Sequence, residues 1–452
     1  MSYPEFHPIH APACALKLNS YGMFLRWIDV LSRWFDFLRG NVRVMTVCEC
    51  VWRSTVDIIW PFLSLYVLEL GGSYETIGLI MAGASLGSML LYPLGGYIAD
   101  YQGRIKLIGY MTFVYALAFL IMGFGESWQW LAVGLFIQNM TTLYWPAIQA
   151  LMADSIPPRQ RGVSFAAFEA IPGAFALLSP IIGAWLIGYL GMRTAMRGLF
   201  FSSFIIASMI AFYRVKALRE TISNPMKLDL SPKGLAGLLR DSYIGAFKVL
   251  SNITRELWIL SILVAVLILS ASLTGSFWVV RVTQVVGLSL QEWATIMMAT
   301  GIVGVLLGIP IGRVVDRVSK KLVVGVSCIG GAIIVFAFLG ATSFTQVALI
   351  AVLSAVIDAF LNSSLRSLFA DITPRGVRGR AMALVGGGRL HLLRGAFASS
   401  IFGKVFQTSG TFVSGYLYAF DHSLPWAILS VTMSAIGVLV ILLVRDPVNP
   451  EV

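Results

Sequence analysis

Two apolar runs of the chain are separated by the hydrophilic stretch Gly96-Tyr97-Ile98-Ala99-Asp100-Tyr101-Gln102-Gly103-Arg104-Ile105-Lys106. This stretch is too short to form a domain and too charged to lie in lipid. Almost half the chain length later the sequence reads Gly312-Arg313-Val314-Val315-Asp316-Arg317-Val318-Ser319-Lys320-Lys321. Both copies keep a glycine, three residues, an aspartate and then basic residues. A repeat at this offset indicates two related halves.

The composition places most of the chain in a membrane. Of its 452 residues, 58% are hydrophobic and only 12% are charged, and the mean hydropathy is +0.82. A soluble globular chain carries about 25% charged residues. The net charge of +11 suggests nucleic acid as a partner, but most of the 33 Lys and Arg residues fall in the loops between apolar runs. The basic charge therefore indicates membrane topology, and we expect no nucleic-acid partner.

Twelve apolar runs approach the roughly 20 residues that a ~30 Å hydrocarbon core requires. They lie at about 44–69, 74–98, 107–125, 128–152, 162–189, 195–213, 257–281, 291–314, 321–342, 345–369, 379–406 and 424–444. The predicted fold class is an all-α membrane protein with twelve transmembrane helices in two pseudo-symmetric six-helix halves.

The predicted domains follow from these runs. Residues 1–43 form an N-terminal tail whose segment 20–40 has the period of an amphipathic interfacial helix. The two halves cover 44–213 and 257–445, the polar stretch 214–256 links them, and 446–452 form a tail. The lysine and arginine distribution places both termini and the linker in the cytoplasm, which indicates a multi-pass protein of the plasma membrane.

The repeated hydrophilic loop also carries a family resemblance. The spacing Gly-x-x-x-Asp-x-x-Gly-Arg-x-Lys between a second and a third membrane helix resembles the signature loop of the major facilitator superfamily. Its matching residues here are Gly96, Asp100, Gly103 and Arg104 in the first copy, and Gly312, Asp316 and Lys320 in the second, where Ser319 replaces the later glycine. The resemblance implies a secondary transporter that works by alternating access, without a cofactor.

A second repeat lies at the ends of the fourth and tenth runs. Asp154 and Arg161 in the first half correspond to Asp371 and Arg378 in the second. Asp100 and Asp316 of the first repeat are expected to accept hydrogen bonds from the next helix N-terminus, or to pair with Arg161 or Arg378, when the cytoplasmic helix ends are close. The resemblance therefore implies a role in conformational gating, whereas the simpler interpretation is that charged loops keep helix ends in water.

Ionisable residues inside the runs fall on few of them. The first run carries Glu49, Arg53 and Asp57 on one helical stripe. Charges at this depth cost several kcal/mol and normally face the interior of a bundle. The other ionisable candidates are Glu169 on the fifth run, Asp358 on the tenth, and Arg389, His391 and Arg394 on the eleventh, and Asn362 lies one turn from Asp358. In the resembling family, runs one, four, seven and ten line the central cavity, five and eleven complete it, and three, six, nine and twelve face lipid.

Two interpretations of these charges remain open. Asp57 and Asp358, with Glu169 and Glu49 as further candidates, are predicted proton-coupling sites, because burial favours protonation of a carboxylate. The alternative is internal ion pairing with Arg53, Arg389 or Arg394. For Glu49 the ion pair is favoured. The three arginines are alternatively contacts for an anionic substrate.

The predicted substrate contacts are Arg53, Asn139, Trp145, Trp278, Asn362, Arg389 and Arg394. The sequence agrees with the drug:proton antiporters of the family at one feature and departs from them at another. Ser179-Pro180-Ile181-Ile182-Gly183-Ala184 partly matches their signature in the fifth helix, whereas the arginine of their fourth helix is absent here.

We therefore predict proton-coupled export of small amphipathic organic compounds by a monomer. The alternative is a symporter or uniporter for a metabolite of the sugar or organic acid class. A membrane sensor is a third hypothesis, although the linker is small for an output domain. No P-loop, nucleophile motif or metal-ligand spacing appears, so an enzyme is not expected.

Overall fold

The computed structural model describes residues 39–157, 161–222, 253–373 and 378–445, and positions 237 and 240. The predicted interfacial helix at 20–40, most of the linker and both tails lie outside these residues. Inside the described helices, the side chains of Asp100, Arg161 and Arg378 are likewise not described.

The N-terminal half consists of six spans, three of which contain a short 3-10 turn. Its elements are α2 (Gly40–Ile59), η1 (Trp60–Phe62), α3 (Leu63–Glu69), α4 (Tyr74–Gln102), α5 (Arg104–Phe124), α6 (Trp128–Met140), η2 (Thr141–Tyr144), α7 (Trp145–Ser155), α8 (Arg161–Phe175), η4 (Ala176–Leu178), α9 (Ser179–Leu190) and α10 (Met192–Ala217). Pro61 is the second residue of the turn η1 itself, whereas Pro146 and Pro180 are the second residues of α7 and α9, the helices that follow η2 and η4. Proline is tolerated there because its missing N–H would have no partner in a first turn.

The C-terminal half repeats this plan with one exception. Its elements are α12 (Arg255–Thr274), α13 (Trp278–Gln284), α14 (Leu290–Val315), α15 (Lys320–Leu339), α16 (Phe344–Ile372), α17 (Arg378–Val385), β1 (Gly388–His391), β2 (Gly395–Ala398), α18 (Ile401–Phe420) and α19 (Leu424–Leu443). The twelve-span, two-half architecture predicted from the sequence is confirmed.

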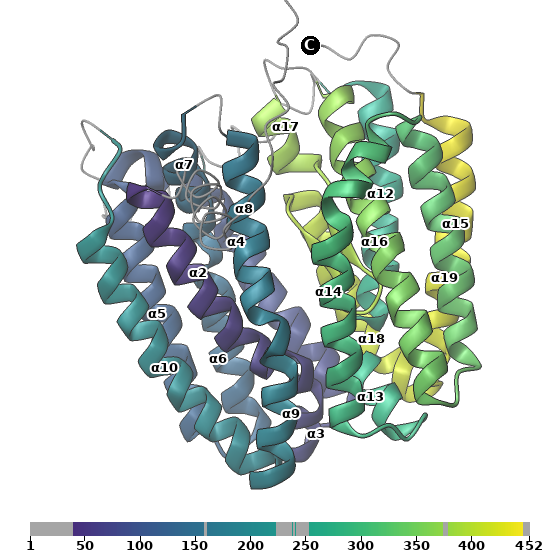
Figure 1. Ribbon diagram of the computed structural model, residues 1–452, viewed down its shortest axis with the longest axis horizontal. Coiled ribbons are helices and arrows are strands. Elements are labelled where there is room, and N and C mark those ends of the chain that lie inside the picture. The colour runs from purple at the N-terminus through teal and green to yellow at the C-terminus, as the bar shows by residue number, and fades with distance from the viewer. Residues whose placement is uncertain are drawn as a thin grey trace, which may run out of the picture.

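The exception is the eleventh span. A continuous helix was expected over 379–406, but the chain forms the short helix α17, an antiparallel β1–β2 hairpin and then α18. The hairpin lies between α17 and α18, inside the length of the bundle that a continuous eleventh helix would have crossed (Figure 1). Gly387 and Gly388 could not be replaced by larger residues here, because a Cβ at either would lie within 3 Å of neighbouring atoms. Local glycine content thus favours the break.

Eight described segments are long and apolar enough on their own to cross a bilayer. They are Arg104–Phe124, Ala167–Leu190, Met192–Ala217, Arg255–Gln284, Leu290–Gly308, Lys320–Leu339, Phe344–Ile372 and Leu424–Leu443. The α2–α3 span is more polar because it carries the three charges of the first run, and α18 is rich in Ser, Thr, Gly and Gln.

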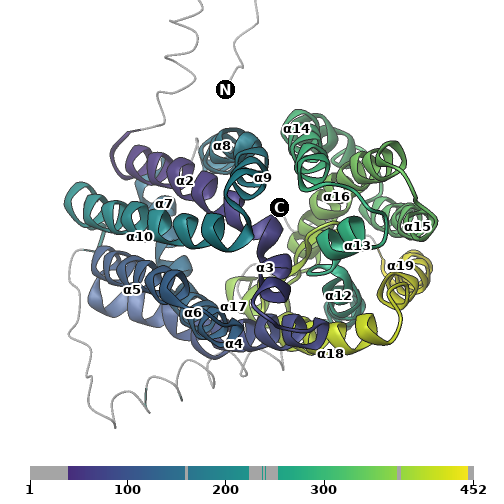
Figure 2. The same cartoon turned by 90° about the horizontal axis from the view of Figure 1, so that it is seen from below.

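The two halves converge at the end where α3, α9 and α13 meet and diverge toward the opposite end (Figure 1). We call these the closed end and the basic end, because Arg104 and Lys320 begin helices at the latter. In the view along the bundle, α5 and α10 lie at one outer edge and α15 and α19 at the other (Figure 2).

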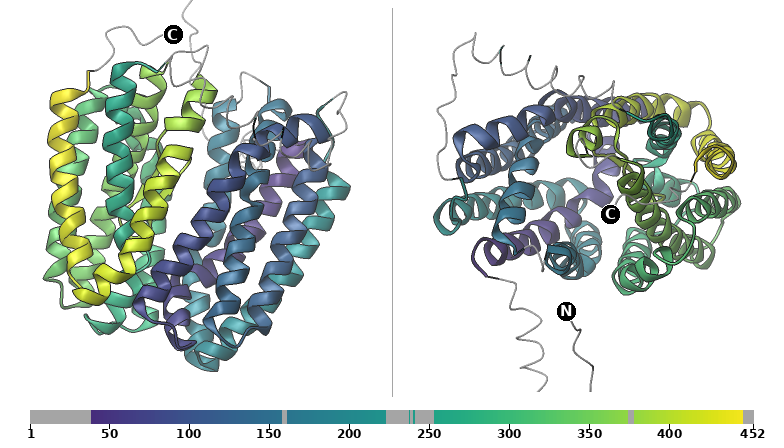
Figure 3. Two further views of the ribbon diagram at one scale, coloured as in Figure 1. Left: turned by 180° about the vertical axis from the view of Figure 1, so that it is seen from behind. Right: turned by 90° about the horizontal axis from the view of Figure 1, so that it is seen from above.

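Helices α4 and α18 form the main contact between the halves and separate toward the basic end (Figure 3). A Cβ at Gly78 would lie 2.9 Å from the Gly415 backbone nitrogen, and one at Gly415 would lie 2.5 Å from the Tyr74 backbone oxygen. Small residues of this kind allow membrane helices to pack backbone to backbone. The Tyr74 hydroxyl also donates to Gln284 Oε1 at 2.8 Å, which ties α4 to α13 at the closed end.

Candidate functional site

The β1–β2 hairpin is fastened to α16 by a side-chain amide. Asn362 donates from Nδ2 to the Leu390 carbonyl at 2.6 Å and accepts from the Leu390 N–H at 2.9 Å. One turn earlier, both carboxylate oxygens of Asp358 accept from the Leu392 N–H at 3.1 Å. The sequence placed both α16 residues in the site, but their principal described partners are backbone groups of the hairpin.

Gln407 of α18 satisfies the other edge of the hairpin. Its Oε1 accepts from the Ala398 N–H at 3.1 Å and its Nε2 donates to the Ala396 carbonyl at 2.9 Å. Sheet edges and non-helical backbone occur at membrane depth only where protein or a water-filled cavity satisfies them. Three side chains from two helices, Asp358, Asn362 and Gln407, therefore make this hairpin possible.

The turn of the hairpin packs against the break between α12 and α13. Gly395 has φ +79°, and a Cβ there would lie 2.8 Å from the Gly275 Cα. A side chain at Gly275 would in turn lie 2.8 Å from the Gly395 Cα. Only glycine at both positions allows the two backbones to approach this closely.

The hairpin presents Arg389 to the other half. Arg389 Nη2 donates to Glu169 Oε1 of α8 at 2.6 Å, and Arg53 Nη1 of α2 lies 3.8 Å from Glu169 Oε2. Arg53 also donates to the Glu169 backbone carbonyl at 3.2 Å. Glu169 thus bridges two arginines from different halves, and each of the three side chains is between 36% and 43% exposed.

Asp57 has no ion-pair or hydrogen-bond partner among the described contacts. The charged groups that act on it most strongly are Arg394, at the hairpin turn, and Arg53, one turn away on α2. On the opposite side of the hairpin, His391 Nδ1 lies 3.7 Å from Asp358 Oδ2. The structure therefore brings the predicted residues of α2, α8, α16 and the hairpin into one central cluster.

Positive charge exceeds negative charge in this cluster. Arg366 of α16 faces the same group, since Arg389 and Glu169 are its nearest electrostatic neighbours. Four arginines (Arg53, Arg366, Arg389 and Arg394) thus meet Glu169 and Asp57, while Asp358 is directed at His391 and backbone amides. Such a set suits a ligand with an acidic group.

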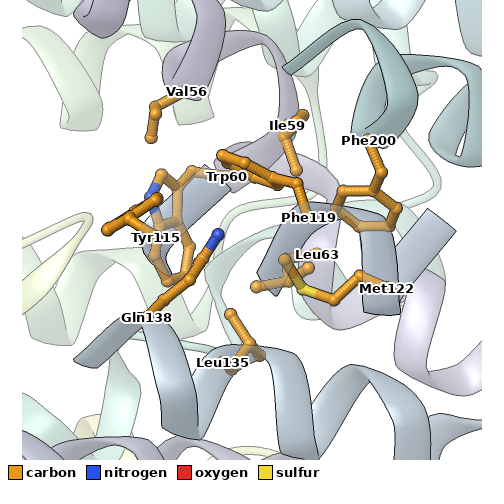
Figure 4. A pocket seen from close by; sticks show the side chains of 10 residues that line it. All are labelled: Val56, Ile59, Trp60, Leu63, Tyr115, Phe119, Met122, Leu135, Gln138 and Phe200. Atoms are coloured by element: carbon orange, nitrogen blue, oxygen red, sulfur yellow. The ribbon is translucent and has the colours of Figure 1, made fainter. Parts of the chain in front are cut away.

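An apolar pocket lies in the N-terminal half beside the break in the first span (Figure 4). It is lined by Val56, Ile59, Trp60, Leu63, Tyr115, Phe119, Met122, Leu135, Gln138 and Phe200. Gln138 Nε2 is buried and has no hydrogen-bond partner in the structure. A single unpaired amide donor in an aromatic pocket is complementary to an apolar ligand with one acceptor.

Three predicted substrate contacts lie elsewhere. Trp278 is 1% exposed and packs against Phe338 and Trp426 in the core of the C-terminal half. In this structure Trp278 is therefore a packing residue of that core, and its contact with a substrate stays a prediction. Trp145 is half-buried and stacks on Tyr144, whereas the Asn139 amide donates to the Leu135 carbonyl of its own helix.

Glu49 lies apart from the central cluster. Its Oε1 accepts from Arg214 Nη2 of α10 at 2.7 Å, and Arg214 Nη1 also donates to Thr112 of α5 at 3.0 Å. Glu49 and Arg214 are 8% and 2% exposed. This arrangement is the internal ion pair that the sequence favoured for Glu49, although the arginine comes from α10 instead of α2.

The basic end carries the same ion pair in both halves. Arg104, at the start of α5, pairs with Asp154 of α7, and Lys320, at the start of α15, pairs with Asp371 of α16. Both pairs lie within one half. Asp316 directly follows the last residue of α14 and is exposed.

The helices do not pack closely at Gly312, because a Cβ there would meet nothing within 4 Å. They pack closely at Gly95, where a Cβ would lie 1.8 Å from the Leu143 backbone oxygen.

The two loop copies differ at the residue before these helices. Gly103 has φ +90°, and Glu220 Oε2 accepts from the Ile105 N–H at 3.1 Å close beside it. In the second copy Ser319 has φ −54° and its hydroxyl caps α15 by accepting from the Leu322 N–H. The replacement of glycine by serine therefore reflects a change from a left-handed turn to a side-chain cap.

Curated relatives match short parts of the chain. A Na⁺, Li⁺, K⁺/H⁺ antiporter of Planococcus maritimus is 29% identical over 151 residues, which cover 32% of this chain and 35% of the relative. The quinolone resistance protein NorA of Staphylococcus aureus is 26% identical over 132 residues, covering 29% and 34%. The chain thus spans about a third of the length of these relatives.

Solved structures match over most of the chain. A POT family transporter in complex with 5-aminolevulinic acid superposes with a TM-score of 0.69 at 14% identity, covering 89% of this chain and 96% of that one. The human organic anion transporter MFSD10 gives 0.62 at 16% identity, with coverage of 88% and 98%. A D-xylose–proton symporter gives 0.61 at 16%, with 91% and 98%. These likenesses show the fold.

The family model of the Major Facilitator Superfamily matches residues 46–394, which is more than half of the chain. This range begins in α2, contains both copies of the hydrophilic loop and ends at the turn of the hairpin. The protein therefore belongs to the major facilitator superfamily, a family of membrane transporters and not of enzymes.

Proposed function

We propose that the protein is a proton-coupled antiporter that exports small amphipathic organic compounds by alternating access. The observation that carries the proposal is the buried Asp358 carboxylate, which holds the hairpin that presents Arg389 and Arg394 to the other half. An ionisable residue at this depth is a functional site by default. The two antiporter relatives support the same direction of coupling.

The coupling step follows from the contacts of Asp358. In its charged form it accepts two hydrogen bonds from the Leu392 amide and faces His391. A proton on Asp358 removes the charge and one acceptor, so it weakens the attachment of the hairpin to α16. The hairpin turn then moves relative to Asp57, because the same turn carries Arg394. Proton binding at α16 and ligand binding at the cluster thereby become linked.

The substrate class follows from the pocket in the N-terminal half. Aromatic and aliphatic side chains form its wall, and Gln138 offers one unpaired donor. We assign the amphipathic body of the substrate to this pocket. The remaining predicted contacts, Trp145 and Asn139, lie on the same span as Gln138 and are proposed to act later in the transport path.

The orientation belongs to the same proposal. We propose that the basic end and both termini lie on the cytoplasmic side of the plasma membrane, which the excess of lysine and arginine at that end supports. The divergence of the halves at the basic end supports a state open to the inside (Figure 1). We propose that Arg104–Asp154 and Lys320–Asp371 brace each half during rocking. Asp100, Asp316, Arg161 and Arg378 would then meet across the halves when the inside closes.

The test is flux in proteoliposomes with and without an imposed pH gradient, with ethidium as an amphipathic probe. Native protein, Asp57→Asn and Asp358→Asn are compared, and Glu126→Gln, an exposed acid near the closed end, is the matched control. We expect gradient-driven flux in the native protein and the control, and loss of gradient dependence in Asp358→Asn. Equal gradient-driven flux in all four proteins would refute proton coupling through Asp57 and Asp358.

The second candidate is a carrier of organic acids, which the excess of arginine in the central cluster favours. It predicts that the same vesicles transport an aromatic carboxylate in preference to ethidium. Flux of neither probe under any gradient would favour a sensor.

A further inference from the structure

A buried lysine lies outside the central cluster, at the N-terminus of α18. Lys404 is 6% exposed, and no acidic side chain within the described chain lies within 4 Å of its ammonium. Among the described contacts, its ammonium lies over the face of Phe397, with Nζ 4.4 Å from the ring centroid. A buried cation at membrane depth without a counter-ion is costly, so its retention calls for a ligand.

The lysine borders a recess at the seam between the halves. The recess is lined by Met89, Ala398, Ser399, Ser400, Ile401 and Lys404. Ser85 and Thr408 are hydrogen-bonded across the halves at 2.9 Å, and Met89 and Lys404 each lie one turn from them toward the basic end. The recess is therefore at the point where α4 and α18 begin to separate.

The start of α18 contributes donors to the same recess. The Ser400 hydroxyl caps the Gly403 N–H at 3.1 Å, and the Lys404 N–H bonds the Ser400 carbonyl. The first-turn amides of Ile401 and Phe402 have no intrahelical acceptor. Helix N-termini attract anions, and an ammonium one turn away adds a full positive charge.

We propose that this recess binds an acidic group, a carboxylate or a phosphate, through the Lys404 ammonium and the first-turn amides of α18. The inference rests on the proposed transport function, because it adds an acidic group to the features that the transported substrate must have. Because the recess is made by both halves, the acidic group is held while α4 and α18 are packed and is released when they separate. Two sources supply this chemistry, a solute and the headgroup of an anionic lipid.

The test is binding of benzoate and of its uncharged analogue benzamide to the purified full chain in neutral detergent, without any gradient. We compare the native protein with Lys404→Met and Lys404→Arg. Lys216→Met is the matched control, because Lys216 also lies 4.4 Å from a phenylalanine ring, that of Phe212, but is exposed at the end of α10.

We expect benzoate to bind native protein and the control, and benzamide to bind at least about tenfold more weakly, the equivalent of one charged hydrogen bond. Lys404→Met loses benzoate binding by a similar factor, while Lys404→Arg retains it. The melting temperature without ligand verifies that each variant is folded. Equal benzoate affinity in native protein and Lys404→Met, or no preference over benzamide, would overturn the proposal.

A second arm separates the two sources. Benzoate binding is repeated in phosphatidylcholine nanodiscs with and without phosphatidylglycerol. Competition by phosphatidylglycerol in native protein assigns the recess to a lipid headgroup, and its absence assigns the recess to a solute. Both arms measure binding without transport. A failure of proton-coupled transport would therefore leave these results unchanged, whereas a failure of this site would alter them.

Discussion

Glu169 of α8 and Arg389 of the hairpin form an ion pair between the two halves of the protein, with Nη2 and Oε1 2.6 Å apart. The pair lies at a hairpin that is itself held by Asp358 and Asn362 of α16. A change at α16 is therefore transmitted to the other half through the position of one arginine. The proposed proton coupling requires such a connection between a titratable group and the interface.

The Glu169–Arg389 pair should couple the halves with modest energy. Both side chains are more than a third exposed, so solvent screening limits the pair to about 1 kcal/mol. A double-mutant cycle with Glu169→Gln and Arg389→Met, measured by thermal unfolding in detergent, should give a coupling free energy of this size. A coupling energy of zero would mean that the two residues do not interact in the populated state. Arg193→Met with Glu69→Gln is the control cycle, because that pair joins elements of one half.

Asn362→Leu should destabilise the hairpin more than Asp358→Asn does. The leucine leaves both the N–H and the carbonyl of Leu390 without partners at membrane depth, at about 1–3 kcal/mol for each group. The asparagine introduced by Asp358→Asn keeps an oxygen acceptor for the Leu392 amide and is nearly isosteric with the aspartate. Hydrogen exchange should therefore rise at Leu390 in Asn362→Leu and change less at Leu392 in Asp358→Asn. The reverse order would show that charge, and not backbone satisfaction, holds the hairpin.

The sequence predicted the architecture because lipid imposes it. Three local signals determine the architecture of a chain in lipid: runs of about 20 apolar residues, the repeated loop, and the distribution of Lys and Arg. The central cluster was also predictable, since Arg53, Asp57, Glu169 and Arg389 each stand out against an apolar background. What one sequence lacks is the pairing of these charges in space.

The hairpin was missed for a physical reason. Its residues are apolar enough to read as part of a span, and the alternation Arg389-Leu390-His391-Leu392 is too short to outweigh that pattern. Its stability depends on Gln407 and on α16, which are recognisable as partners only once the fold is known. The triple glycine at 386–388 was the one local signal of a break.

Arg214 illustrates the same limit. It lies one residue beyond the expected sixth span and was counted among the basic residues of the linker. In the structure α10 continues to Ala217, so that Arg214 is inside the helix and paired with Glu49.

Arg214→Met should be among the most destabilising single changes in the N-terminal half. It leaves the buried Glu49 without its partner, and breaking a buried pair from one side costs about 3–5 kcal/mol. The double change Glu49→Leu with Arg214→Met should recover most of this loss, because no charge remains buried. Thermal unfolding of the three variants checks both statements. A double variant as unstable as Arg214→Met would show that packing of the arginine, not the charge of Glu49, dominates.

Gly395→Ala separates steric contact from backbone strain. Gly395 and Gly191 both have φ +79°, a backbone conformation that is strained for any residue with a Cβ, so alanine at either position carries a cost from the backbone. A Cβ at Gly191 meets nothing within 4 Å, whereas one at Gly395 lies 2.8 Å from the Gly275 Cα. Gly395→Ala should therefore lower the melting temperature further than Gly191→Ala and should also displace Arg394, which precedes it. If the two variants melt together, the hairpin turn tolerates movement away from α12, and its contact with Gly275 is not required for stability.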